Sequence, residues 1–132
     1  MQETNGLLSR ERMLSPAPRR FHLVSTKAGR ARLQTPLVED VRQVRVYLLD
    51  GPYEQRADRG SRTGDLLAAK MLVDSDNQRL FSDQEAIGGC FDGFDNEAME
   101  QIRGACRKLS GWDTDPDMAA IEETVKNSES GP

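Results

Sequence analysis

The chain has 132 residues, enough for one domain with a hydrophobic core and too few for two. Hydrophobic residues make up 36% of it and aromatic residues 5%, so the core must consist mostly of aliphatic side chains. No stretch approaches the roughly 18 to 20 apolar residues of a membrane span, and residues 1–20 contain no apolar block typical of a secretion signal. We therefore expect a cytosolic protein in which Cys90 and Cys106 are buried free thiols.

The net charge of -4 is divided unevenly along the chain. Residues 1–62 hold 12 Lys or Arg against 7 Asp or Glu, whereas residues 63–132 hold 6 against 15. This split permits head-to-tail self-association, and two ordinary solvated surfaces would explain it equally well. The pI of about 5.1 and the acidic second half argue against nucleic acid as the main partner.

The N-terminal region predicts an arm followed by a hairpin. Residues 1–20 combine basic side chains with prolines and offer little to bury, which indicates a flexible basic arm. Residues 21–25 form the first predicted strand, and residues 27–29 form a turn. Residues 30–35 are then expected to return as the antiparallel partner strand.

Residues 41–49 alternate in polarity, which predicts a half-buried antiparallel strand. Its apolar face is expected to carry Val44, Val46 and Leu48. The Asp-Gly-Pro sequence at residues 50–52 ends this pattern, and residues 53–59 are expected to form a short polar helix that stops near Gly60.

Helices are predicted for residues 62–126. Thr63 or Asp65 can cap a helix that continues through residues 66–73, and these are apolar around most of the helix circumference. Such a helix is expected at the centre of the core. Residues 74–78 then form an acidic turn.

Two further helices have clear start signals. Ser82 followed by Glu85 matches a capping box, which predicts a short helix through Ile87. Asp95 can cap the next helix, and Gly111 suits the left-handed residue that ends it. The apolar face of that helix, with spacings of three and four, consists of Met99, Ile102, Cys106 and Leu109.

Asp115 followed by Pro116 predicts the start of a final helix, and residues 127–132 form a polar tail. The narrow apolar stripe of this helix comprises Met118, Ile121, Thr124 and Val125. The sequence thus predicts a single α+β domain over residues 21–126, mainly α. In it a small N-terminal antiparallel β element, residues 21–49, precedes a helical part.

The acidic turn is the sharpest candidate for a metal site. An EF-hand calcium loop that begins at Asp74 would take oxygen ligands from Asp74, Asp76, Gln78, Ser82 and Glu85. The sixth position of such a loop needs a positive φ and is normally glycine, whereas this chain has Arg79 there. An acidic helix–helix turn is the simpler interpretation, and a calcium-binding helical module is kept as the alternative.

Catalytic patterns are poorly represented. His22, the only histidine, lies in a predicted strand without a recognisable nucleophile. Cys106 falls on the apolar face of a helix, and Gly88-Gly89 lacks the Lys and Ser or Thr of a phosphate-binding loop. We expect neither enzymatic activity nor a cofactor.

Three segments occur in a familiar order. An apolar helix leads into residues 72–83, LVDSDNQRLFSD; a later helix ends in residues 107–112, RKLSGW; and an acidic segment closes with residues 125–129, VKNSE. Across residues 35–130 this order resembles the tail assembly chaperones of long, non-contractile-tailed bacteriophages and related prophages. The departures from the family pattern are Asn77 or Gln78 in place of glycine, and Ser110 in place of asparagine.

The resemblance implies a protein that binds the tape measure protein, keeps its long hydrophobic helices soluble and recruits tail tube subunits. It also implies a homo-oligomer in the host cell cytoplasm that is absent from the mature virion. The family often makes a longer form by programmed frameshifting, and residues 125–127 are compatible with slippery A-rich codons. A generic adaptor is the alternative. The expected interaction residues are Leu80, Phe81, Met99, Trp112, Met118 and Ile121.

Overall fold

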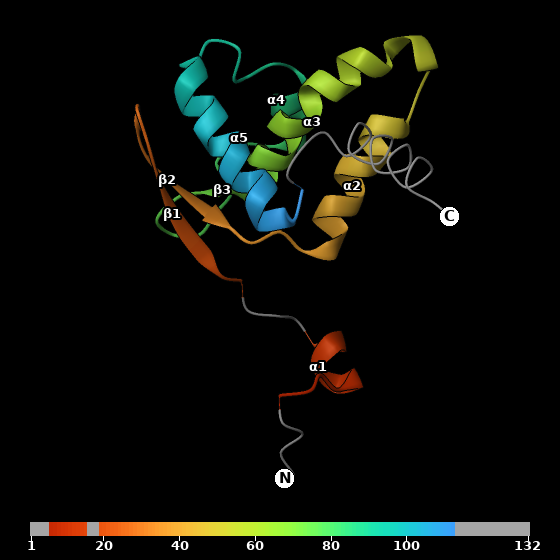
Figure 1. Cartoon of the computed structure of the whole chain (residues 1–132), viewed down its shortest axis with the longest axis vertical. Helices are drawn as coiled ribbons and strands as arrows, with labels where there is room; N and C mark the ends of the chain where they lie inside the picture. The colour runs from red at the N-terminus through yellow and green to blue at the C-terminus, as the bar shows by residue number, and fades with distance from the viewer. Residues whose placement is uncertain (1–5, 16–18, 113–132) are drawn as a thin grey trace, which may run out of the picture.

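The computed structural model describes residues 6–15 and 19–112. It confirms the mainly α, α+β class, with a three-stranded antiparallel sheet and helices (Figure 1). The elements are α1 (Arg10–Leu14), β1 (Phe21–Thr26), β2 (Gly29–Gln34), α2 (Val38–Leu49), the 3-10 helix η1 (Tyr53–Gln55), α3 (Arg56–Met71), β3 (Leu72–Val73), α4 (Asp83–Ile87) and α5 (Asn96–Ser110). The helix expected after Asp115 and the tail at residues 127–132 lie outside the described residues.

The N-terminal hairpin is confirmed. β1 and β2 pair in antiparallel register, from Phe21 opposite Gln34 to Thr26 opposite Gly29. The chain reverses through a two-residue turn, and Gly29 has a φ of 132°, a conformation that side chains with a Cβ rarely adopt. The preceding α1 has no buried residue.

The strand predicted for residues 41–49 is wrong, because this segment belongs to helix α2. Val44 and Leu48 are buried, and their spacing of four places them on one helical face. Val46, which alternation placed on the same face, is 57% exposed. A helical period therefore describes the buried positions better than a period of two. The Asp40 carboxylate also supports the helix start, because it accepts the Leu37 N–H at 2.8 Å.

The predicted start of the next helix is also wrong. α3 begins at Arg56 and continues through Gly60, so Thr63 and Asp65 are buried positions inside the helix and not caps. α3 contains two glycines, Gly60 and Gly64, and the packing of α5 accounts for the second one. A Cβ at Gly64 would lie 2.8 Å from Cδ of Arg103, a side chain of α5 that packs across this point.

The central helix ends at Met71, two residues before the end predicted from the sequence. Its last two positions, Leu72 and Val73, form β3, which pairs with Leu33 and Arg32 of β2. The third strand of the sheet therefore comes from the chain after α3, and the sheet order is β1-β2-β3.

α4 and α5 are confirmed with their caps. The Ser82 hydroxyl accepts the Glu85 N–H and the Glu85 carboxylate accepts the Ser82 N–H, which completes a capping box. Asp95 accepts the Ala98 N–H at the start of α5, and Gly111 ends α5 with a φ of 79°.

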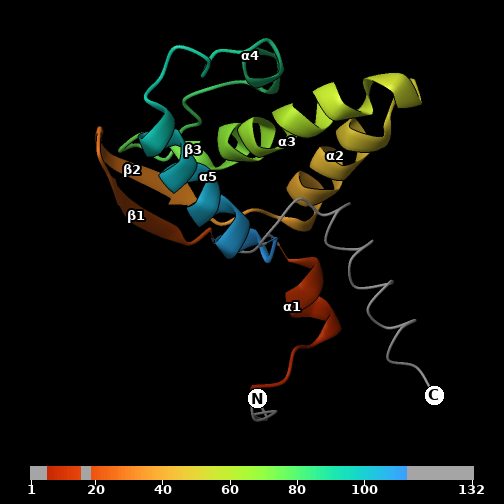
Figure 2. The ribbon, with the colours of Figure 1, turned by 45° about the horizontal axis from the view of Figure 1, so that its top comes forward.

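α3 is the centre of the domain, since it packs against α2, α4 and α5. The hairpin and α2 lie on opposite sides of it (Figures 1 and 2). Among the described residues, no helix has the length and apolar composition needed to cross a membrane. The buried hydrophobic cluster comprises Leu33, Val44, Leu66, Leu67, Ala68, Ala69, Met71, Leu72, Ala86, Phe91, Met99, Ile102, Cys106 and Trp112.

Candidate binding groove

The acidic turn uses its leading carboxylate to hold its own backbone. Asp74 Oδ1 accepts the N–H groups of Asp76 and Gln78 at 2.8 and 3.0 Å. The only non-glycine residue with a positive φ in the described part of the chain is Asn77, at 65°. In a calcium loop that conformation would fall at Arg79, which instead donates to the Ala69 carbonyl.

Two of the remaining proposed ligands, Ser82 and Glu85, have other partners. Ser82 and Glu85 bind each other's backbone N–H groups in the capping box of α4. Within the ranges 6–15 and 19–112, no three His, Cys, Asp or Glu side chains gather in a group that could hold a metal ion. The structure thus places Asp74, Asp76 and Glu85 without a common centre.

The acidic residues around the start of α5 are spread over three separate contacts. Asp92 pairs with Arg62 of α3 at 2.7 Å, Asp95 caps α5, and Glu97 pairs with Lys27 at 3.0 Å. The hydrogen bond from Arg62 lowers the pKa of Asp92. These carboxylates connect the α4–α5 loop and the hairpin turn to the helices.

The two cysteines differ, which corrects the expectation that both are buried. Both are free thiols, but Cys90 is exposed. Cys106 is fully buried in α5, and burial raises the pKa of its thiol to about 12. Burial and nearby Glu85 also raise the pKa of Cys90. His22 lies opposite Leu33 in the hairpin, and its buried Nε2 has no hydrogen-bond partner in the described part of the chain.

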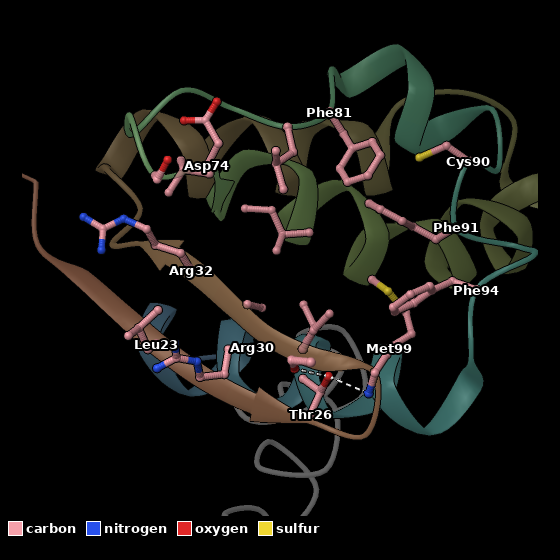
Figure 3. Close-up of a pocket in the computed structure, with 18 residues that line it drawn as sticks. Leu23, Thr26, Arg30, Arg32, Asp74, Phe81, Cys90, Phe91, Phe94 and Met99 are labelled. Carbon is pink, nitrogen blue, oxygen red and sulfur yellow. Dashed lines mark hydrogen bonds between the residues drawn. The ribbon is translucent and has the colours of Figure 1, made fainter.

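A concavity lies between the hairpin and the loops that flank α4 (Figure 3). We call it the Phe91 groove; its cavity volume is about 670 Å³. Four separate parts of the chain contribute to it, namely the hairpin, the β3 turn, the α4–α5 loop and α5. Its lining residues are Leu23, Thr26, Ala28, Gly29, Arg30, Ala31, Arg32, Leu72, Val73, Asp74, Ser75, Leu80, Phe81, Cys90, Phe91, Phe94, Met99 and Ile102.

Aromatic side chains build one wall of the Phe91 groove. Phe81 and Phe91 meet edge to face, with ring centroids 4.8 Å apart. Phe91 and Met99 are buried, whereas Phe94 is 44% exposed. On the opposite side Leu23 of β1 is 59% exposed. The groove is thus apolar at its base and open to solvent.

Three of the predicted interaction residues, Leu80, Phe81 and Met99, line this groove together. Trp112 does not; it is buried at the end of α5, where the Arg45 guanidinium lies 5.4 Å from its ring centroid. The prediction for Met118 and Ile121 lies outside the described residues. Sequence reasoning missed Phe94, although an aromatic residue between Gly93 and Asp95 has few neighbours in sequence that could bury it.

The basic residues of the hairpin have different surroundings. Arg32 donates to the Asn77 carboxamide oxygen and lies 4.5 Å above the Phe21 ring centroid. Lys27 is paired with Glu97. Within the described residues Arg30 has no ion pair or side-chain hydrogen bond, and it lies at the groove wall. Arg30 therefore places a positive charge beside an apolar surface, with no partner in this part of the chain.

Comparison with known proteins identifies no relative. No protein-family model, curated protein or solved structure matches the chain.

Proposed function

We propose that this protein is a non-enzymatic assembly chaperone that holds an apolar segment of a partner protein in the Phe91 groove. The observation that carries the proposal is an apolar groove whose mouth exposes Leu80, Phe94 and Leu23. Isolated apolar residues are common on protein surfaces, but a contiguous concave set is typical of a binding site.

The tape measure protein of a bacteriophage tail is the partner that we propose, on the strength of the segment order in residues 72–83, 107–112 and 125–129. We propose tail tube subunits as the second partner. The chaperone would also associate with itself and act in the host cell cytoplasm before the virion is complete. A segment destined for a protein assembly needs cover for its apolar side chains until it meets its final partners. The groove offers such cover.

Co-expression tests the proposal. The tape measure gene of the same genome would be expressed alone, with the wild-type chaperone, and with two variants that each introduce one carboxylate. Phe94→Asp places the charge at the groove mouth, whereas Tyr53→Asp alters a 79% exposed ring on η1, which does not line the groove. We expect wild type and Tyr53→Asp to raise the soluble fraction of the tape measure protein, and Phe94→Asp to lose most of this effect.

Two results would contradict the proposal. A tape measure protein that stays as insoluble with the wild-type chaperone as it is alone would remove the chaperone role. Alternatively, equal activity of Phe94→Asp and Tyr53→Asp would place the binding surface elsewhere. Both replaced side chains are partly or largely exposed, so both variants are expected to fold. Circular dichroism of each variant checks this.

A further inference from the structure

The strand β2 is only partly covered by its neighbour β3. It has six residues, and β3 pairs with just two of them, Arg32 and Leu33. The groove extends past the point where this pairing stops, since Gly29, Arg30 and Ala31 are all among its lining residues.

Two hydrogen bonds fix which backbone groups face the groove side. The Thr35 N–H donates to the Arg20 carbonyl at 2.8 Å, so by antiparallel alternation Leu33 and Ala31 also point their backbone groups toward β1. Arg32 and Arg30 must then point theirs the other way, toward β3.

The second hydrogen bond agrees with this phase. The Leu72 carbonyl accepts the Leu80 N–H at 3.1 Å and therefore points away from β2. Its neighbour Val73 is consequently the residue that pairs with Arg32 through backbone hydrogen bonds.

Arg30 pairs with Ser25 of β1, but on its other side it has no strand partner among the described residues. The chain departs from β2 after Val73, because the turn that starts at Asp74 folds back through the bond from the Asp74 N–H to the Gln78 carbonyl. In the described part of the chain, nothing continues β3 far enough to reach Arg30. Its N–H and C=O therefore form a short open strand edge beside an apolar groove.

We propose that the partner segment binds in an extended conformation. It continues the sheet beyond the end of β3, by pairing with the backbone of Arg30. This proposal rests on the proposed function for the use of the groove and adds the conformation and chemistry of what binds there. An apolar side chain of the segment enters the groove over Phe91. A neighbouring Asp or Glu meets the Arg30 guanidinium, which has no ion pair or side-chain hydrogen bond within residues 6–15 and 19–112.

An extended segment fits this edge better than a helix. A helix satisfies its own backbone groups and would leave the N–H and C=O of Arg30 to water or unpaired beneath it. A strand satisfies both groups and sends alternate side chains toward the groove and away from it. Apolar and acidic residues in alternation are therefore the preferred pattern.

The test uses the full chain and a blocked seven-residue peptide that alternates valine and glutamate. Binding is measured as protection of Cys90, a groove residue, from alkylation and as slowed amide exchange at Arg30. Two N-methylated forms of the peptide carry their methyl groups on alternate sets of residues. We expect one form to bind about tenfold more weakly and the other to bind like the parent, since only one set faces β2.

A charge exchange supplies the second arm. Arg30→Glu keeps the backbone edge and reverses the charge of a side chain that is exposed. We expect this variant to prefer a valine–lysine peptide to the valine–glutamate peptide, the reverse of the wild-type order, by about tenfold.

Several outcomes would overturn the inference. Equal binding of both N-methylated forms, an unaltered amide exchange rate at Arg30, or tighter binding of a helix-stapled peptide would each exclude strand pairing. Slowing of Arg30 exchange with rising concentration of the protein alone would assign the edge to a second copy. The co-expression result is independent: a soluble tape measure protein with no strand pairing would leave the chaperone role intact.

Discussion

α3 and the hairpin face the same core, yet they are packed very differently. Every residue of α3 from Asp65 to Met71 is buried, whereas β1 has no buried residue and β2 has only its last two. Stability is therefore concentrated in α3 and its helical neighbours. The hairpin side keeps apolar surface and backbone groups available, as elements that bind partners must.

The largest expected difference in stability is between two leucine substitutions, one in α3 and one at the groove. Leu67 is 1% exposed in α3, and Leu67→Ala should lower the free energy of unfolding by about 2–5 kcal/mol. Leu80 is 50% exposed at the groove, so Leu80→Ala should cost less than about 1 kcal/mol. Urea denaturation followed by circular dichroism measures both. Similar losses would mean that the two regions are equally packed.

The next effect concerns the ion pair at the end of α3. The Lys70 side chain is 2% exposed and donates to Asp83 at 2.9 Å, and Asp83 also accepts from Arg79. Asp83→Asn should lower the free energy of unfolding by about 1–2 kcal/mol, because Asp83 is partly exposed and its neighbours remain. Asp76→Asn, in the exposed turn, is the matched control and should change little.

The same pair predicts a dependence on pH. Burial raises the pKa of Asp83, but the hydrogen bonds from Arg79 and Lys70 outweigh it, so the pKa is lowered overall. A lowered pKa means that the stabilisation is present above the unfolded value of about 3.9 and is lost as the pH falls through the folded value. The stability difference between wild type and Asp83→Asn should thus shrink below about pH 4. A difference that persists at pH 2 would exclude this ion pair as its cause.

A smaller loss is expected at the start of α4. The Ser82 hydroxyl accepts the Glu85 N–H, and Ser82→Ala should cost about 1 kcal/mol by the loss of this cap. Ser75→Ala lies in the turn before it and should stay within about 0.5 kcal/mol of wild type. Thermal unfolding of the two variants side by side provides the measurement.

The cysteines provide the comparison with the least effect on stability. A thiol reagent at pH 8 should modify Cys90 in the folded protein and reach Cys106 only after denaturation, because Cys106 is fully buried with a pKa of about 12. Mass spectrometry identifies the modified residue. Rapid modification of Cys106 would reveal opening of α5.

Local signals predicted the hairpin, α4 and α5 well. The capping box at Ser82, the Asp95 cap and the Gly111 terminator depend on residues three or four positions apart, so sequence alone contains them. Alternating valines misassigned α2, because the periods of two and 3.6 share several positions over nine residues.

The features that involve distant residues could not be predicted. Gly64 is tolerated in α3 because Arg103 of α5 fills its space, and Leu72 and Val73 form a strand because β2 lies beside them. The Phe91 groove depends on four segments that meet only after folding. Sequence supplied three of its residues as interaction candidates but neither its shape nor the open edge at Arg30.

The position of Trp112 makes its fluorescence a local probe of the structure. Trp112 is the single tryptophan of the chain and is 8% exposed, with Arg45 of α2 above its ring. Its indole N–H is buried and has no hydrogen-bond partner among the residues that the structure describes. Its fluorescence therefore reports on a single site, the junction of α2 with the end of α5. Since that junction does not line the groove, emission from Trp112 can report unfolding or rearrangement there without interference from a ligand bound beside Phe91.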